Sequence, residues 1–271
     1  MARQKVYSLE IFALFAYVAV GIIAGLIGGL LGLSGGVVTV PCLVLLFHLL
    51  DFPQSILMHM AIGTSLAAMV LTGIASTWAH HGHKGVMWDI VLLMIPGIII
   101  GCLLGSVVAH FLSGIILQII FGLFICSLGA YVLLQKKKPQ PAKRPHKTLY
   151  SWLGMGIGSL ASLLGIGGGV FTVPLLISFR YSEKKAIGTS AAVGLLITFM
   201  ATIGYLYFGM NVVMVRESLG YIYLPAFALI GLGTVFFAPV GAKLAQRIAS
   251  AKLRKIFACT LILVGVFMIF N

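Results

Sequence analysis

The sequence predicts an all-α integral membrane protein: a polytopic helical bundle of two homologous halves, arranged as an inverted repeat, with glycine-rich broken or re-entrant helices. The first observation is composition, because the chain has 271 residues of which 61% are hydrophobic and only 8% charged. A soluble domain carries about 25% charged residues. This chain has too little polar surface to face water, so we expect the lipid bilayer to surround it.

The second observation is a glycine-rich stretch that occurs twice, at residues 25–41 and 158–174. The two copies share the pattern Leu-Leu-Gly-x-[Ser/Gly]-Gly-Gly-Val-x-Thr-Val-Pro. In hydrocarbon, unpaired backbone groups are costly, so a break in a helix has to line a cavity or lie inside protein. Matched breaks in two repeats therefore point to a substrate site.

The apolar runs predict the helices in order, and a spanning helix needs about 20 residues. Runs 36–50 and 168–179 are short and each follows a glycine cluster, so each is predicted to be half of a broken helix. The first run, 9–33, either crosses the membrane or turns back within it, and the sequence leaves both open. The remaining predicted helices are 56–79, 89–109, 115–134, 149–166, 186–208, 219–242 and 253–270.

A basic linker that contains prolines is the third observation. It reads QKKKPQPAKRPHK, which is incompatible with a continuous helix or with burial in a membrane. It divides the chain into an N-terminal membrane repeat at 1–134, a linker at 135–148 and a C-terminal membrane repeat at 149–271. The halves match beyond the glycine stretch, since Ala-Ile-Gly-Thr-Ser occurs at 61–65 and again at 186–190.

Lysine and arginine indicate the orientation. If the linker is cytoplasmic, every Lys and Arg other than Arg3, Lys5 and Arg216 falls in a cytoplasmic segment, as the positive-inside rule requires. The loop at 110–114 is then external while its repeat equivalent near 246–250 is cytoplasmic, which predicts an inverted repeat. We expect the inner (plasma) membrane as the location. Because the net charge of +13 comes from these loops, nucleic acid is not a predicted partner.

The two glycine breaks form the predicted binding site. The start of a helix offers unpaired N–H groups and a partial positive charge, which suit a small anionic substrate. Alternatives are close helix packing for the glycines and bonds to their own helix for the hydroxyls. The predicted substrate-binding residues are Ser34, Gly35, Gly36, Thr39, Thr64 and Ser65 in the first half and Gly167, Gly168, Gly169, Thr172, Thr189 and Ser190 in the second.

Local geometry at the breaks can also be predicted. We expect Pro41 and Pro174 in the first turn of the second half-helix, where the missing N–H costs nothing. We expect a positive φ at Gly36 or Gly169, because glycine adopts it without steric cost.

Catalytic and metal signatures are absent from the sequence. No HExxH, GxSxG or P-loop motif occurs, so the sequence predicts no enzyme, no catalytic residue, no metal and no cofactor. No Asp, Glu, Lys or Arg lies inside an apolar core, which argues against a carboxylate proton relay but leaves coupling through a histidine open. His59 and His48 are interpreted as interfacial or packed.

The paired motifs also resemble a known family. Two copies of Gly-[Ile/Leu]-[Gly/Ser]-Gly-Gly-x-x-x-Val-Pro, each followed by Ala-Ile-Gly-Thr-Ser, are similar to the sulfite exporter TauE/SafE family of bacterial membrane permeases over nearly the whole chain. The resemblance implies transport of small sulfur-containing anions, such as sulfite, sulfonates or sulfoacetate. Alternating access is the expected mechanism, with an anion channel or a non-transporting scaffold as alternatives. The sequence does not predict the oligomeric state.

Overall fold

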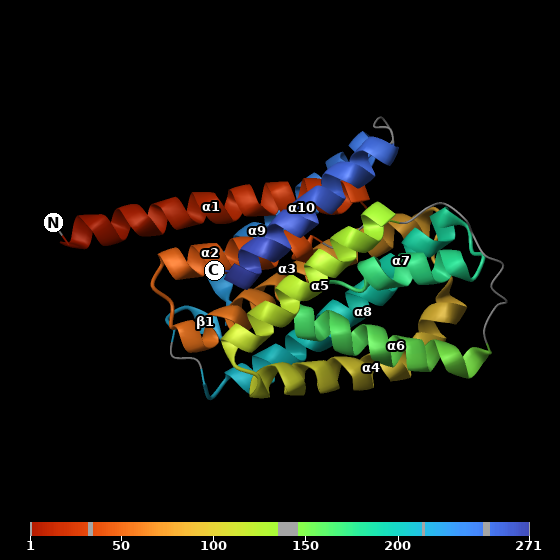
Figure 1. The fold of residues 1–271 in the computed structure, drawn as a ribbon, viewed down its shortest axis with the longest axis horizontal. Helices are drawn as coiled ribbons and strands as arrows, with labels where there is room; N and C mark the ends of the chain where they lie inside the picture. Colours follow the sequence, from red (N-terminus) through yellow and green to blue (C-terminus); the bar gives the residue numbers. More distant parts are fainter. Residues whose placement is uncertain (1, 32–34, 135–145, 213–214, 246–249, 271) are drawn as a thin grey trace.

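The computed structural model describes residues 2–31, 35–134, 146–212, 215–245 and 250–270 as a bundle of long helices (Figure 1). The first half contains α1 (Ala2–Leu31), α2 (Gly36–Leu49), α3 (Gln54–Gly82), α4 (Trp88–Phe111) and α5 (Gly114–Leu134). The second half contains α6 (Lys147–Leu164), α7 (Gly169–Ser178), α8 (Glu183–Gly209), α9 (Leu224–Ala245) and α10 (Ser250–Phe270). A short antiparallel hairpin of β1 (Ser218–Leu219) and β2 (Ile222–Tyr223) precedes α9.

The helices have the length and the apolar surface that a lipid bilayer requires. Six of the described helices, α1, α3, α4, α5, α8 and α9, are long and apolar enough to cross a membrane. Their outer surfaces carry large apolar side chains, among them Trp78, Phe111 and Phe236, which are 69–80% exposed. Such surfaces are unfavourable in water and favourable in hydrocarbon. The predicted all-α polytopic membrane fold is confirmed.

Two helices are broken where the sequence predicts it. The glycine stretches separate α1 from α2 and α6 from α7. With 14 and 10 residues, α2 and α7 are roughly 21 and 15 Å long at 1.5 Å per residue, well short of a hydrocarbon core of about 30 Å. They are half-length helices whose first residues lie inside the bundle.

The prolines lie deeper in these helices than predicted. Pro41 and Pro174 are each the sixth residue of their helix, so the first-turn expectation is wrong. The reason is that both helices start at the last glycine of the cluster, which moves the proline into the second turn. There each proline lacks the N–H that would bond the carbonyl four residues earlier, at Val37 or Val170.

Glycine stripes allow several helix pairs to pack backbone to backbone. On α4, Gly97, Gly101 and Gly105 recur every fourth residue, and a Cβ at Gly101 would overlap the Met155 carbonyl on α6. Gly21 of α1 likewise lies close to α9, on which the Ile230 carbonyl oxygen is 2.8 Å from the Cβ position. In lipid, association depends on such close packing because the hydrophobic effect between helices is lost.

The main helix contacts between the two halves are symmetric: each of these contacts made by a helix of one half has an equivalent made by the corresponding helix of the other half. The first helix of each half packs along the fourth helix of the other, so α1 lies on α9 and α6 lies on α4. The third helices, α3 and α8, pack on each other, and so do the last helices, α5 and α10. We call this arrangement pseudo-two-fold packing.

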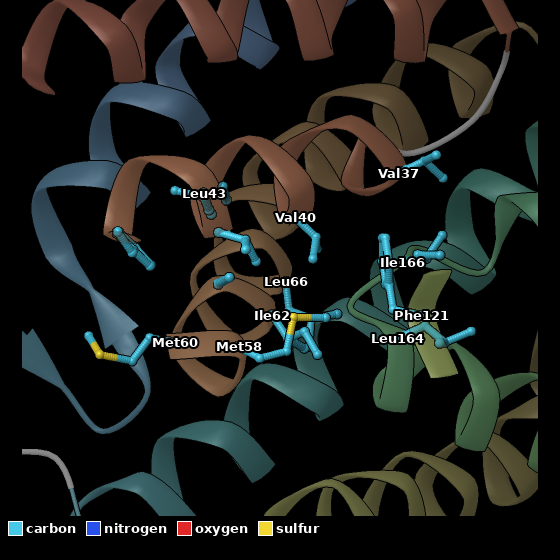
Figure 2. Close-up of a cluster of buried hydrophobic side chains, with 14 of the residues drawn as sticks. Val37, Val40, Leu43, Met58, Met60, Ile62, Leu66, Phe121, Leu164 and Ile166 are labelled. Carbon is cyan, nitrogen blue, oxygen red and sulfur yellow. The ribbon is translucent and has the colours of Figure 1, made fainter. Parts of the chain in front are cut away.

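The largest buried apolar cluster surrounds α2, α3 and the second break (Figure 2). Val37 and Val40 of α2 lie in the same cluster as Leu66 of α3. Ile166, from the break itself, lies beside Phe121 of α5 in the close-up. The second break is therefore enclosed by packed side chains, as hydrocarbon demands of irregular backbone.

Candidate functional site

The two glycine breaks, which belong to different halves, meet inside the bundle. A Cβ built on Gly36, the first residue of α2, would lie 2.6 Å from the carbonyl oxygen of Gly165 and 2.8 Å from the Met69 methyl carbon. The hydroxyl of Ser65 on α3 donates to that same carbonyl at 3.4 Å. The start of α2 is thus held directly against the segment that connects α6 to α7.

Gly165 makes the sharp turn of the second break. Its φ of 66° is in the left-handed region, and it is the C-cap of α6, so that the Ile166 N–H donates to the Ala161 carbonyl at 3.0 Å. Glycine adopts this conformation without the clash that a Cβ would cause. The predicted positive φ at Gly36 or Gly169 is wrong, because each of these residues is the first of an α-helix.

Both half-helices begin without a side-chain cap. The N-cap residues are Gly35 and Gly168, and neither helix start receives a side-chain hydrogen bond. The carbonyl of Gly168 accepts the N–H groups of Phe171 and Thr172, so the helical ladder starts only there. The first N–H groups of such a helix have no intrahelical acceptor and carry partial positive charge. Such N–H donors are chemically suited to an anionic group.

The hydroxyls next to the breaks differ between the halves. Thr39 donates to the carbonyl of Gly35 at 3.0 Å, within its own helix. The corresponding Thr172 is 0% exposed and its oxygen has no hydrogen-bond partner. Ser190 on α8 is likewise buried without a partner, whereas its counterpart Ser65 has one. A buried polar group without a bond costs roughly 1–3 kcal/mol, so these two hydroxyls require an explanation.

Thr172 points at the start of its own helix. Its hydroxyl oxygen is 3.6 Å from the Cβ position of Gly168, the N-cap residue of α7. Residues 165–170 around it are buried, and they include the predicted Gly167, Gly168 and Gly169. The uncapped end of α7 and an unpartnered hydroxyl thus occupy the same place.

Thr64 and Thr189 have a structural role that the sequence did not reveal. The Thr64 hydroxyl accepts the backbone N–H of Tyr223 at 3.0 Å, and the Thr189 hydroxyl accepts that of Met87 at 3.0 Å. Each donor directly precedes the fourth helix of the other half. The Ala-Ile-Gly-Thr-Ser motif therefore docks one half onto the other, and a substrate contact by Thr64 or Thr189 stays a prediction.

We predict that Thr64→Val lowers the melting temperature of the purified protein. Valine fills the same space but leaves the Tyr223 N–H without its acceptor, at a cost of roughly 1–3 kcal/mol. Thr77→Val on the same helix is the control, because the Thr77 hydroxyl is buried and has no partner to lose. Equal melting temperatures for Thr64→Val and the wild type would contradict the docking role.

The predicted site residues are thus partly brought together. Gly36 and Ser65 from the first half meet the second break, with Gly35 and Thr39 beside them on α2. Ser34 lies outside the described residues. Gly165 is not among the predicted site residues, although the Leu-Leu-Gly shared by both copies contains it. Among the described residues no group of three or more His, Cys, Asp or Glu could hold a metal ion.

Comparison with known proteins gives consistent results. The family model described as "Sulfite exporter TauE/SafE" matches residues 17–268. A "Probable membrane transporter protein" of Haemophilus influenzae is 37% identical over 249 residues, covering 91% of this chain and 94% of that protein. A protein of Methanocaldococcus jannaschii, also named a probable membrane transporter, is 27% identical over 93% of this chain and 94% of its own length. No solved structure matches.

Proposed function

The chain belongs to the sulfite exporter TauE/SafE family of membrane transporters, and from that premise we propose that it moves small sulfur-containing anions across the inner membrane. Sulfite, sulfonates and sulfoacetate-like molecules are the substrates that the family name and the site chemistry favour. The meeting of the two uncapped glycine breaks carries the proposal.

The chemistry of the breaks suits such an anion. A sulfite or sulfonate group presents three oxygens that accept hydrogen bonds, and a helix N-terminus supplies N–H donors with partial positive charge. The hydroxyls of Thr172 and Ser190 are buried donors without a partner. An anion bound at the start of α7 would accept hydrogen bonds from the helix N–H groups and from the Thr172 hydroxyl, and would remove the cost of burying that hydroxyl without a partner.

Alternating access between two inverted halves is the mechanism we propose. The pseudo-two-fold packing supports it, as does the opposite course of the adjacent helices α5 and α10 in Figure 1. Gly35, Gly36 and residues 165–170 are buried, so a substrate reaches them only when helices move apart. Such enclosure favours a carrier over a permanently open channel.

Flux measurements in proteoliposomes test the proposal. The purified protein is reconstituted and supplied with labelled sulfite, methanesulfonate or sulfoacetate. We expect saturable uptake and counterflow, in which an unlabelled anion inside the vesicles accelerates entry of the labelled one. Uptake that rises without saturation would indicate a channel. No flux of any of these anions would support a scaffold and overturn the proposal.

A cytoplasmic linker is the second part of the proposal, and we predict that a cysteine placed there resists membrane-impermeant thiol reagents in intact cells. Gln140→Cys is introduced after replacement of Cys42, Cys102, Cys126 and Cys259. The matched control is Ser113→Cys in the exposed turn between α4 and α5, which we expect to be external and to react. Reaction at Gln140→Cys with protection at Ser113→Cys would reverse the orientation.

A further inference from the structure

A buried cluster of histidine and tyrosine side chains lies where the hairpin before α9 enters the bundle. His59 of α3 is 3% exposed, and its ring stacks on Tyr221 with centroids 5.2 Å apart. His110 of α4 contacts the Tyr221 hydroxyl through its Nδ1 at 3.3 Å. Tyr205 of α8, in the same half as Tyr221, packs edge-on against it. Four elements thus contribute one group each.

The hydrogen bonds fix the tautomer of His59. Its Nε2 lies 2.9 Å from the carbonyl oxygen of Ala109, so Nε2 carries the hydrogen and donates. Nδ1 is then an acceptor in the neutral ring, and it is buried without any partner. An imidazole in this state has one vacant basic nitrogen, which a proton can occupy.

Burial disfavours a positive charge on His59, and the carbonyl groups at the end of α4 offset part of that cost. Ala109 lies in the last turn of α4, and the carbonyl of the C-cap residue Leu112 also faces the ring. Helix C-termini carry partial negative charge and favour the protonated form of a nearby histidine. A charge on His110 would repel a charge on His59.

The remaining nearby groups do not compensate a charge on His59. Burial raises the pKa of the Tyr221 hydroxyl, which therefore stays neutral and lies within hydrogen-bond distance of His110 Nδ1. The Tyr205 hydroxyl is buried and has no partner. Asp51, Arg216 and Glu217 lie in exposed turns, and none of them forms an ion pair with either histidine in the described part of the chain.

The cluster is connected to the substrate site through α3 and the hairpin. His59 precedes Ser65, which touches the second break, by six residues, or roughly 9 Å along the helix. A Cβ at Gly63, between them, would lie 2.6 Å from the carbonyl oxygen of Tyr221. A charge that alters the stacking of Tyr221 on His59 would therefore act on the hairpin contact that joins the two halves.

The cluster is specific to one end of the molecule. At the offset set by the repeated Ala-Ile-Gly-Thr-Ser motif, His59 corresponds to Lys184. Tyr221, two residues before the docked Tyr223, corresponds to Gly85, two residues before the docked Met87. The repeat alone would not produce this cluster, since the equivalent places in the other half hold residues of different chemistry.

We propose that His59, with His110 and Tyr221, forms a proton-binding site that couples anion transport to the movement of a proton. The proton adds to Nδ1 of His59 and leaves from the same atom, and no other covalent bond changes. This inference rests on the proposed anion transport, which it extends by naming the coupling ion and its site. By linkage, a proton that alters anion affinity must itself be bound differently when the anion is present.

Gradient-driven uptake tests the coupling. Methanesulfonate is the probe, because it stays ionised throughout the pH range in which histidine titrates. In proteoliposomes of the wild type, we expect an imposed pH gradient to accumulate labelled methanesulfonate several-fold above its equilibrium level. His59→Gln should abolish the accumulation, although glutamine keeps an N–H for the Ala109 carbonyl. His48→Gln, at an exposed histidine bonded to Gln54, is the control and should retain it.

A second measurement needs no variant. Methanesulfonate is added to the purified wild type in weakly buffered detergent with an indicator dye, and we expect a proton to be taken up or released on binding. Binding without proton exchange, or undiminished gradient-driven accumulation by His59→Gln, would overturn the proton site and leave anion transport intact. Failure of every sulfur anion to bind or cross the membrane would instead overturn the proposed function, and the coupling with it.

Discussion

Gly36→Val is expected to abolish anion flux. The Cβ position of Gly36 lies 2.6 Å from the carbonyl oxygen of Gly165, a separation that real Cβ atoms do not tolerate. The nearest atom is backbone, and Gly165 is held by its left-handed turn and by Ser65, so it cannot swing aside as a flexible side chain would. Valine therefore forces the first residue of α2 away from the second break and separates the two halves of the proposed site.

We expect Gly36→Val to destabilise the protein as well, because the added side chain overlaps the backbone of the second break. Overpacking of this kind costs roughly 1–3 kcal/mol, so the variant should also melt at a lower temperature than the wild type. Gly156→Val on α6 is the matched control, because Gly156 is exposed and a Cβ there meets no atom within 4 Å. If Gly36→Val supports normal flux, the contact between the breaks serves packing alone and the anion binds elsewhere.

The helix breaks could be predicted from the sequence because they depend on local patterns. Glycine clusters followed by short apolar runs occur in both halves, and α2 and α7 begin within a residue of the predicted starts. The pairing of α1 with α9 and of α6 with α4 depends on contacts between distant segments. Periodicity reports which face of a helix is apolar, and in a membrane almost every face is, so it cannot specify the partner.

The roles of individual hydroxyls could not be predicted for a related reason. Thr64 and Thr172 both follow glycines in repeated motifs, so they look equivalent in the sequence. In the structure, Thr64 accepts an N–H from the other half while Thr172 has no partner. Whether a hydroxyl is free depends on what the rest of the bundle places beside it. The sequence indicates that His59 is interfacial or packed, and it cannot place His59 beside His110 and Tyr221, because these residues are far apart in the chain.

Thr172→Val is expected to weaken anion binding without destabilising the empty protein. Valine preserves the volume and removes a hydroxyl that is buried without a partner, so no internal hydrogen bond is lost. The melting temperature in the absence of substrate should stay the same or rise, because the cost of burying that hydroxyl disappears. Binding of sulfite or methanesulfonate should weaken about threefold to tenfold, since one net hydrogen bond is worth roughly 0.5–1.5 kcal/mol.

Two further variants, one at Thr172 and one at Thr39, distinguish a loss of anion binding from a loss of packing. Thr172→Ser keeps the hydroxyl and should bind nearly as tightly as the wild type. Thr39→Val, at the corresponding residue of α2, removes a hydroxyl that already donates to Gly35, so its effect on affinity should be smaller and its effect on melting larger. The measurements are titrations of purified protein with the anion and thermal melting with and without it. An unchanged affinity of Thr172→Val, or a lower melting temperature without substrate, would show that this hydroxyl does not face the anion.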